Sequence, residues 1–400
     1  MSNATQDILK SAIHSPFPRL RALLDGIPPG IEPAIDMTIG EPRHAMPEFL
    51  GAELAKALPG FAKYPPIQGS PDLRQAIAVW LERRYDLKGK VGPDKHVTAL
   101  CGSREGLFSA IFPAIDRKPV HANPAALIPN PFYQAYLAAA LAARAEPVML
   151  PCRAETHFLP DLGWLSQQTE LLTRAACFFL CSPANPQGTV ASAEYWGKAI
   201  ALCRQHDIML FADECYSEIY DVTPPPGALE ASGTDFKNVI SFNSLSKRSN
   251  LPGLRSGFAA GDADFIARLT QFRNVAGPQL PGPLQAASAA IWRDEGHVAK
   301  SRDIYRQKFK LVREIFGNRG GHLAPEGGFF LWLEMKHLGG SEKAAVTIWQ
   351  RTGVKVLPGA YLSYAVAGTA DPGRDYVRAA LVHDLATTET ALHRLASVLE

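Results

Sequence analysis

The sequence predicts an α/β protein in which a mostly parallel sheet, covered by helices on both faces, is joined to a smaller α+β domain. Between residues 97 and 242, short apolar segments alternate with segments of helical periodicity, which is typical of strands joined by crossover helices. Ligands bind such sheets at the carboxyl ends of the strands. The unusual residues that follow the apolar segments are Ser103, Tyr133, Asn185, Asp213 and Lys247. Their positions predict one ligand site at that edge of the sheet.

Length and composition are those of a globular protein with a large core. The 400 residues are 46% hydrophobic and 20% charged, with a formal net charge of +2. This balance gives no electrostatic reason to expect nucleic acid or a membrane surface as a partner. The six cysteines form no CxxC pair and predict reduced, buried thiols in a cytoplasmic protein, without a metal site. We see no secretory signal and no apolar run of about 20 residues that could span a membrane.

The first 90 residues contain mainly helical segments. We predict a helix over 16–27, a short strand over 34–39, and helices over 47–58 and 71–85. Pro16 and Pro71 suit helix starts, because the first turn of a helix does not need the amide that proline lacks. Gly40 follows the strand and precedes Pro42, and a glycine in such a turn lets the backbone approach a ligand closely.

The alternating region supplies the strands of the sheet. We predict these strands over 97–100, 125–128, 145–150, 177–181, 208–212 and 239–242. The intervening helices are predicted over 104–115, from Tyr133 to about residue 143, and over 191–206. The strands are apolar throughout, which indicates that helices cover both faces of the sheet.

The character of the chain changes after about residue 284. A long charged helix over 284–316 is followed by strands near 327–332, 354–357 and 376–382, and by a closing helix over 387–399. This pattern predicts a smaller α+β domain. We therefore expect a large domain over residues 47–283 and a small domain formed by both chain ends, residues 1–46 and 284–400.

Lys247 lies in the stretch Ser244-Leu245-Ser246-Lys247, directly after an apolar strand. A lysine in such a position is costly to bury unless chemistry uses its amine. We therefore predict that Lys247 holds a cofactor as a Schiff base.

A cofactor of this kind with a pyridine ring and a phosphate needs several partners, and the strand ends offer them. Asp213 can serve as the anion at the ring nitrogen, Tyr216 and Asn185 as donors to a ring oxygen, and Tyr133 as an aromatic face. A phosphate is favoured by backbone amides at a helix start. The residues expected around it are Ser103, Arg104, Ser244, Ser246 and Arg255. Taken singly, such residues are more often helix caps, turns or core packing.

These motifs together resemble those of the pyridoxal-phosphate-dependent aminotransferases of the aspartate aminotransferase superfamily, fold type I. The resemblance extends over nearly the whole chain. It is carried by Ile39 to Pro42, Tyr64 with Gly69, Gly102 to Arg104, Pro129 to Tyr133, Ser182 to Pro186, Asp213 to Tyr216, Ser244 to Lys247 with Arg255, and Tyr376 to Arg378. It implies a large domain with a mostly parallel seven-stranded sheet, and pyridoxal 5'-phosphate as the cofactor.

The resemblance also implies a role for each site residue. Lys247, Asp213 and Tyr216 are the expected catalytic residues: Lys247 bonds to the cofactor, Asp213 pairs with its ring nitrogen, and Tyr216 contacts its ring oxygen together with Asn185. Tyr133 stacks on the ring, and Ser103, Arg104, Ser244, Ser246 and Arg255 hold the phosphate. Tyr64 is expected to reach the active site of a neighbouring subunit, so that a homodimer is implied. Arg378 is expected to bind the substrate α-carboxylate, assisted by Asn185 and the backbone of Gly40.

Longer stretches are similar to the proteobacterial N-succinyldiaminopimelate aminotransferases. Examples are residues 129–136, 213–220 and 244–250. This similarity implies an exchange of an amino group between L-glutamate and N-succinyl-L,L-2,6-diaminopimelate, as part of lysine biosynthesis. Because that substrate carries further carboxylates, we expect Arg43 to bind a distal one, with Arg19 as a second candidate. A solvated surface charge explains either arginine as well.

Other functions stay open or are disfavoured by missing motifs. An aminotransferase for an aromatic, alanine or kynurenine type of substrate, or a β-lyase, would share the cofactor machinery. The S-x-x-K pattern of penicillin-binding hydrolases requires K-T-G and S-D-N motifs, and neither occurs in the sequence. A transcription regulator would need an added DNA-binding segment, and a nicotinamide enzyme a G-x-G-x-x-G motif, which is also missing.

Overall fold

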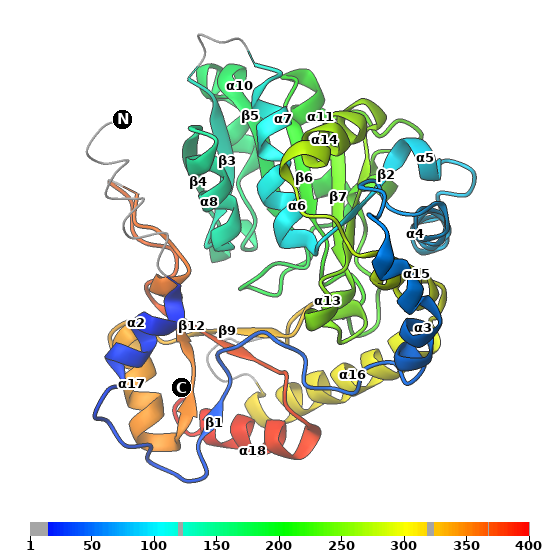
Figure 1. The fold of residues 1–400 in the computed structure, drawn as a ribbon. Helices are drawn as coiled ribbons and strands as arrows, with labels where there is room; N and C mark the ends of the chain where they lie inside the picture. Colours follow the sequence, from blue (N-terminus) through cyan, green and yellow to red (C-terminus); the bar gives the residue numbers. More distant parts are fainter. Residues whose placement is uncertain (1–14, 119–122, 318–323, 367, 400) are drawn as a thin grey trace.

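A seven-stranded sheet forms the centre of the molecule (Figure 1). The computed structural model describes residues 15–118, 123–317, 324–366 and 368–399. The strands are β2 (Val97–Leu100), β3 (Ala125–Asn130), β4 (Glu146–Pro151), β5 (Ala175–Cys181), β6 (Met209–Asp213), β7 (Val239–Ser244) and β8 (Gly257–Gly261), in the spatial order β2-β8-β7-β6-β5-β3-β4. β8 runs antiparallel to both of its neighbours, whereas the pairs from β7 to β4 are parallel. The predicted mostly parallel sheet is confirmed.

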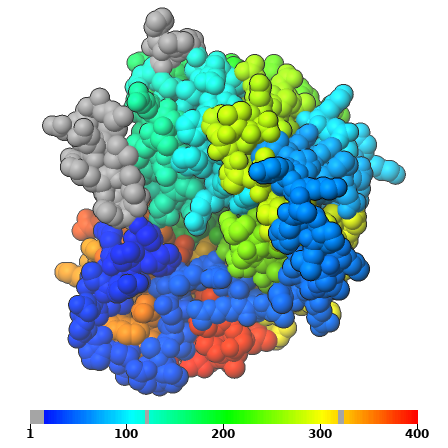
Figure 2. Space-filling view, viewed as in Figure 1, coloured from blue at the N-terminus to red at the C-terminus, as the bar shows by residue number. Residues whose placement is uncertain are grey.

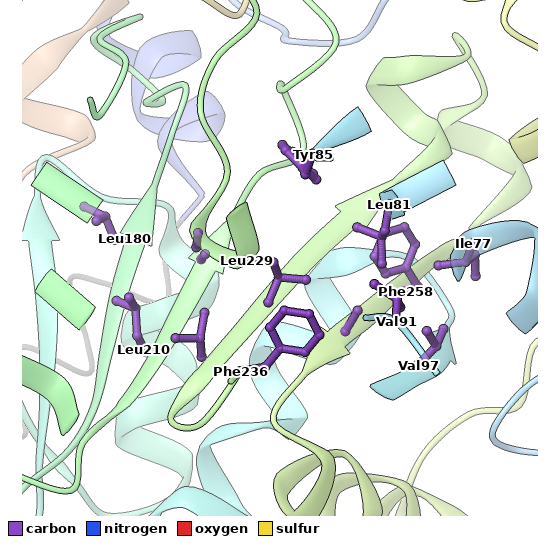
Figure 3. Packing of buried hydrophobic residues seen from close by; sticks show 14 of the residues in the cluster. Ile77, Leu81, Tyr85, Val91, Val97, Leu180, Leu210, Leu229, Phe236 and Phe258 are labelled. Carbon is purple, nitrogen blue, oxygen red and sulfur yellow. The ribbon is translucent and has the colours of Figure 1, made fainter. Parts of the chain in front are cut away.

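Two apolar layers cover the faces of this sheet, because neighbouring residues of a buried strand point to opposite sides. Phe178 of β5 belongs to the cluster under α4 (Pro71–Arg84) and α11 (Ala193–Gln205). Its neighbour Phe179 belongs to the cluster under the helices of the other face. Figure 3 shows side chains of the first cluster from strands and helices on one side of the sheet. The helices of the second face are α6 (Ser103–Ser109), α7 (Ile111–Ile115), α8 (Gln134–Ala142) and α14 (Ala263–Ala276).

The strand β8 and the helix α14 were not predicted from the sequence. The segment of β8 is rich in glycine and alanine, which are weak strand formers. Gly257 lies so close to β7 that a Cβ atom would come within 2.5 Å of the Asn243 carbonyl oxygen. The small residue that weakens the sequence pattern is therefore required by the packing.

Both chain ends meet in a second unit below the sheet (Figure 1). The strands β9 (Phe330–Glu334), β11 (Leu357–Pro358) and β12 (Tyr376–Ala380) form an antiparallel sheet in the order β11-β12-β9. The N-terminal strand β1 (Ile35–Asp36) pairs in parallel with β10 (Val354–Lys355). Figure 2 shows the N-terminal segment lying over the C-terminal third and continuing onto the large sheet unit. The helices of this unit are α2 (Pro16–Leu23), α16 (Gly296–Phe316), α17 (Ser341–Thr352) and α18 (Leu385–Ala396).

The predicted single helix over 284–316 is wrong, because the structure has two helices there. α15 (Gly282–Arg293) ends before Asp294, whose backbone is extended, and α16 starts at Gly296. The Asp294 carboxylate accepts a hydrogen bond from the His297 amide at 3.0 Å, so that this residue stops one helix and caps the next.

The helix α15 packs on the large sheet unit. Its Trp292 ring lies 4.8 Å from that of Trp80 in α4, and its buried residues share the cluster of that unit. We therefore propose that the boundary between the domains lies at Asp294, eleven residues after the predicted division between 283 and 284.

The remaining elements are short. The helices are α3 (Leu50–Ala57), α5 (Pro93–His96), α9 (Leu162–Ser166), α10 (Thr169–Arg174), α12 (Ala228–Ala231) and α13 (Leu245–Arg248), with 3-10 turns at Leu58–Ala62, Ala154–Thr156, Pro252–Leu254, Lys336–Leu338 and Gly359–Tyr361. Among the described residues, no helix is both long and apolar enough to cross a membrane.

Candidate active site

Lys247 lies between the two units of the chain. It belongs to the one-turn helix α13, which begins where β7 ends. Its Nζ atom donates a hydrogen bond to the carbonyl oxygen of Gly40, and lies 5.4 Å from the centre of the Phe329 ring. Burial, together with the nearby Arg378 and Arg255, lowers the pKa of Lys247 to about 8, although Cys215 and Glu41 oppose this effect. Its amine is therefore partly neutral near physiological pH, as a nucleophile or base requires.

Asp213 is a buried carboxylate at the carboxyl end of β6. Its side chain accepts hydrogen bonds from the Tyr136 hydroxyl at 2.6 Å and, weakly, from the Cys215 amide at 3.4 Å. No lysine, arginine or histidine of the described chain forms an ion pair with it, and burial raises its pKa. A protonated ring nitrogen would supply the missing positive charge. A buried carboxylate without a cationic partner fits the predicted cofactor.

A small cradle lies beside α13 at the start of α6. A Cβ atom on Gly102 would come within 2.5 Å of the Arg255 guanidinium, so that the backbone and this cation lie close together. Gly102 also has a φ of 83°, which favours glycine. The Ser103 hydroxyl lies 3.0 Å from the Cys215 sulfur, next to the Asp213 segment. The structure thus brings together a helix start, a hydroxyl and an exposed cation, as the predicted phosphate site requires.

Ser244 and Ser246 take part in bonds within the protein. The Ser244 hydroxyl accepts from the Ser246 amide at 3.1 Å and lies 3.1 Å from the Ser256 carbonyl oxygen and 2.9 Å from the Ser246 hydroxyl. Ser244 thereby caps α13. Contact of Ser244 with a phosphate would require one of these bonds to be exchanged, and the roles of both serines stay predictions.

Tyr133 contacts both Arg104 and Tyr136, the residue that binds Asp213. The Arg104 guanidinium donates a hydrogen bond to the Tyr133 oxygen, and the Tyr133 ring meets that of Tyr136 edge to face at 5.6 Å. Tyr136 in turn holds Asp213. The predicted stacking residue and the predicted anion are therefore linked through one intervening tyrosine.

Arg378 lies in the middle of β12, where it joins three distant parts of the chain. Its guanidinium donates to the Asn185 side-chain oxygen at 2.9 Å and to the Thr38 carbonyl oxygen at 2.7 Å. The Nε atom has no hydrogen-bond partner among the described residues. Burial lowers the pKa of Arg378 to about 10, with Tyr216 opposing. A buried guanidinium without a carboxylate partner is suited to bind the carboxylate of a ligand.

Two phenylalanines at the start of β9 form the floor of this region. The Phe330 ring centre lies 4.3 Å from the Arg378 guanidinium carbon, and the Phe329 ring lies below Lys247. Tyr216 packs edge to face on both rings, and burial raises its pKa. Gly40 approaches Phe330 so closely that a Cβ atom would come within 2.5 Å of its ring. Gly40 is therefore fixed as a glycine by the same floor.

Three predicted residues have other surroundings. Arg43 is exposed, and its guanidinium lies 3.2 Å from the His383 ring nitrogen Nδ1. The Arg19 guanidinium lies over the Tyr361 ring at 3.8 Å. The Tyr64 side chain is 97% exposed in the single chain. The expected contacts of these residues with a substrate or a neighbouring subunit stay predictions.

Four further residues of the site were not predicted from the sequence, namely Tyr136, Thr38, Phe329 and Phe330. Tyr136 left one signal, because apart from Gln134 at its start the helix is otherwise alanine and leucine, and a buried hydroxyl needs a partner. Thr38 contributes a backbone atom, for which the identity of the side chain gives no sign.

Comparison with known proteins gives the family. The sequence model of the family described as aminotransferase class I and II matches residues 32–395. An LL-diaminopimelate aminotransferase of Dehalococcoides mccartyi is 32% identical over 372 residues, which cover 92% of this chain and 91% of that protein.

Solved structures agree with this match. An aminotransferase from Neisseria meningitidis has a TM-score of 0.91 and 38% identity, over 98% of this chain and 99% of that one. A probable N-succinyldiaminopimelate aminotransferase from Thermus thermophilus has a TM-score of 0.82 and 26% identity, over 96% of this chain and 100% of that one. The predicted α/β fold is thereby confirmed. The chain belongs to the class I and II aminotransferases, a family of enzymes that use pyridoxal phosphate.

Proposed function

We propose that this aminotransferase exchanges an amino group between L-glutamate and N-succinyl-L,L-2,6-diaminopimelate, with Lys247 as the cofactor lysine and Arg378 as the α-carboxylate site. The observation that carries the proposal is the Arg378 guanidinium, buried, paired with two neutral oxygens and left with a free Nε atom. Both proposed amino donors carry an α-carboxylate that can neutralise this charge.

The cofactor supplies a carbonyl group that condenses with amines and a ring that withdraws electrons when it is bound. The protein groups nearby have contacts that suit such a cofactor. The Asp213 carboxylate would pair with the protonated ring nitrogen, and the Tyr136 hydroxyl orients that carboxylate through a hydrogen bond of 2.6 Å. The cradle of Gly102, Ser103 and Arg255 would hold the phosphate.

Lys247 acts as the acid and base of the reaction. Its pKa of about 8 would allow the amine to take a proton from the substrate Cα and to hold that proton for return to the reacting groups. The Gly40 carbonyl oxygen, which accepts a hydrogen bond from Nζ, orients the amine. Arg378 and Asn185 meanwhile hold the carboxylate, so that the Cα–H bond faces the lysine.

The choice of substrate rests on similarity to proteins whose names contain diaminopimelate. The segments 129–136, 213–220 and 244–250 resemble the N-succinyldiaminopimelate aminotransferases. The similar structure from Thermus thermophilus is described as a probable enzyme of that kind. A second candidate is free LL-diaminopimelate, which is favoured by the name of the Dehalococcoides mccartyi relative. Both substrates carry an α-carboxylate and a distal carboxylate. They differ at the distal amino group, which is free in one candidate and carries a succinyl group in the other.

We also propose a cytoplasmic homodimer. The apolar residues exposed next to Tyr64 include Leu58 and Phe61, which lie 54% and 59% exposed in the 3-10 turn after α3. Such an apolar surface is typical of an interface. Burial of this surface against a second copy would bring Tyr64 toward the phosphate site of that copy.

A panel of amino donors tests the proposed substrate. With 2-oxoglutarate as the acceptor, we expect the kcat/KM for N-succinyl-L,L-2,6-diaminopimelate to exceed that for free LL-diaminopimelate and for aromatic amino acids by about 100-fold, because one hydrogen bond to a charged group contributes roughly 1.5–3 kcal/mol. A preference for free LL-diaminopimelate would establish the second candidate instead. Release of pyruvate and ammonia from a cysteine conjugate, without consumption of 2-oxoglutarate, would indicate a β-lyase.

The variant Arg43→Gln tests the distal contact. We expect it to raise the KM of the succinylated donor while the KM of glutamate changes little. Arg19→Gln is the matched control, because Arg19 is also exposed and rests on Tyr361. If Arg43→Gln leaves the KM of the succinylated donor unchanged, Arg43 is a surface charge, and if Arg19→Gln raises it, the distal site lies at α2.

A further inference from the structure

The three residues that follow Lys247 all bind the junction between α15 and α16. This segment, Arg248-Ser249-Asn250, includes the end of the one-turn helix α13 and the turn after it. The function described above assigns it no role. Its contacts, however, join the lysine to the start of the long helix that leads into the small domain.

Arg248 makes the largest set of these contacts. Its side chain is 2% exposed, and its guanidinium donates to the carbonyl oxygens of Ile291 and Asp294 at 3.1 Å each, and to the Glu295 carboxylate at 2.6 Å. The guanidinium carbon also lies 4.8 Å from the centre of the Trp292 ring. One guanidinium thus binds the last turn of α15 and the two residues between α15 and α16.

The next two residues extend this attachment. The Ser249 hydroxyl lies 2.8 Å from the Nε2 atom of His297, in the first turn of α16. The Asn250 amide donates to the Ser301 hydroxyl at 3.3 Å and to the carbonyl oxygen of Ala45 at 3.2 Å. Ala45 lies five residues after Gly40, whose carbonyl oxygen binds the Lys247 amine. The segment therefore contacts both the start of α16 and the stretch 40–45 that binds the Lys247 amine.

A one-turn helix cannot fix the position of a side chain by its own hydrogen bonds, because such short helices are unstable in isolation. The position of α13 must come from its tertiary contacts, and Ser244 holds only its start. We propose that Arg248 is a positioning residue for Lys247: by tying the end of α13 to the α15–α16 junction, it fixes the Lys247 amine relative to Gly40 and Asp213. The inference rests on the proposed role of Lys247 as the cofactor lysine.

The choice of arginine follows from the geometry. Three acceptors at two helix ends surround the guanidinium, and a lysine amine at the same place cannot reach all of them in a plane. Glu295 supplies the compensating negative charge, and it is shared with Arg83 at the surface. Arg83 therefore contacts the same carboxylate without contacting α13, which makes it a matched control.

The test compares the cofactor-loaded variants Arg248→Lys, Glu295→Gln and Arg83→Ala with the unaltered protein. The first readout is the pH titration of the visible absorption of the bound cofactor, which reports the ionisation of the group attached to Lys247. The second is the rate at which pyridoxal phosphate binds to the apoprotein. Melting temperatures are measured alongside to follow stability separately.

We expect Arg248→Lys to move the midpoint of the absorption titration by about one pH unit, as displacement of an ionising group from its partners does. Its binding of pyridoxal phosphate should be about 10-fold slower, as for a loss of orientation. Glu295→Gln should change both readouts in the same direction, and Arg83→Ala should change neither.

A purely structural role for Arg248 would lower the melting temperature of Arg248→Lys but leave both readouts unaltered, and this result would overturn the proposal. If Arg248→Lys does not fold, Glu295→Gln decides the question by the same two readouts. A failure of the unaltered protein to show a visible absorption with pyridoxal phosphate would instead refute the role of Lys247 itself.

Discussion

Arg378 donates a hydrogen bond to the Asn185 side-chain oxygen at 2.9 Å, across a separation of 193 residues. Asn185 lies in the loop that follows β5 of the large sheet, whereas Arg378 belongs to β12 of the C-terminal sheet. The Thr38 carbonyl oxygen, from the N-terminal segment, completes the set of partners. The proposed carboxylate site therefore exists only where both sheet units and the N-terminal segment meet.

The first prediction concerns this pair. Arg378→Lys should lower kcat/KM for all amino donors by about 100-fold, because a lysine cannot form the planar fork and one charge-assisted hydrogen bond contributes roughly 1.5–3 kcal/mol. The binding of pyridoxal phosphate, followed by visible absorption, should persist. Equal losses for glutamate and for the second donor are expected, since both carry the α-carboxylate. A loss confined to one donor would contradict the assignment.

The second prediction concerns Tyr136. Its hydroxyl stabilises the ionised Asp213 carboxylate and lowers its pKa, so Tyr136→Phe should raise the pKa of Asp213 further. The acid limb of the pH profile of kcat/KM should then move to higher pH, with about 10-fold lower activity below pH 7, as for a lost hydrogen bond to a charged group. Tyr195→Phe is the control, because its hydroxyl donates to the Pro160 carbonyl oxygen at 2.7 Å. An acid limb that stays in place would contradict this role of Tyr136.

The third prediction concerns the buried Lys308 of α16. Its amine donates to the Leu381 carbonyl oxygen at 2.7 Å and lies 3.0 Å from the His44 ring nitrogen Nε2, next to the Tyr305 ring. Burial lowers its pKa from the ordinary 10.5 to about 7, with Asp384 opposing. Between these two pKa values the unfolded chain binds more protons than the folded chain, so the lysine makes the free energy of unfolding rise with pH.

Lys308→Met should remove this contribution. The free energy of unfolding, measured with urea between pH 7 and pH 10, should rise less steeply for the variant, and the difference should amount to several kcal/mol over that range. His44 does not titrate in this interval, because burial and Lys308 lower its pKa to about 4. Parallel curves for the two proteins would show that Lys308 is charged throughout in the folded state.

The fourth prediction concerns the exposed Tyr64. If Tyr64 serves the active site of a second copy, a mixed dimer of Lys247→Ala and Tyr64→Ala subunits contains one site with both residues intact. Co-expression and separation by two affinity tags should then yield roughly half the activity of the unaltered dimer, as expected for one independent site of two. If Tyr64 acts within its own subunit, or not at all, the mixed dimer should have no more activity than the mean of its two parent variants.

The positions of many candidate site residues can be predicted from the sequence, since strand ends are visible as apolar runs followed by polar residues. Asp213, Asn185 and Lys247 were found in this way, and the structure brings Asn185 to Arg378 as expected. The end of α15 before Asp294 was not predicted, because helical periodicity continues beyond Gly296, and the break comes from the extended backbone of Asp294 and its hydrogen bond to the His297 amide.

Contacts between segments that lie far apart in the sequence could not be predicted. Nothing in the sequence of α8 indicates that the Tyr136 hydroxyl meets Asp213, 77 residues away. The hydrogen bond between Arg248 and Glu295 was not predicted for the same reason. A charged pair formed by two different elements produces no periodic pattern in the sequence. The positions of site residues at strand ends were thus predictable from the order of the strands. The hydrogen-bond partners of these residues were not.

The most direct test of the account is to identify the residue that carries the cofactor. The protein is loaded with pyridoxal phosphate, reduced with borohydride and digested, and the modified peptide is located by mass spectrometry. We expect one pyridoxyl group, on Lys247, and a visible absorption that shifts when glutamate is added before reduction. A label on another lysine such as Lys308, or no label with Lys247 intact, would contradict it.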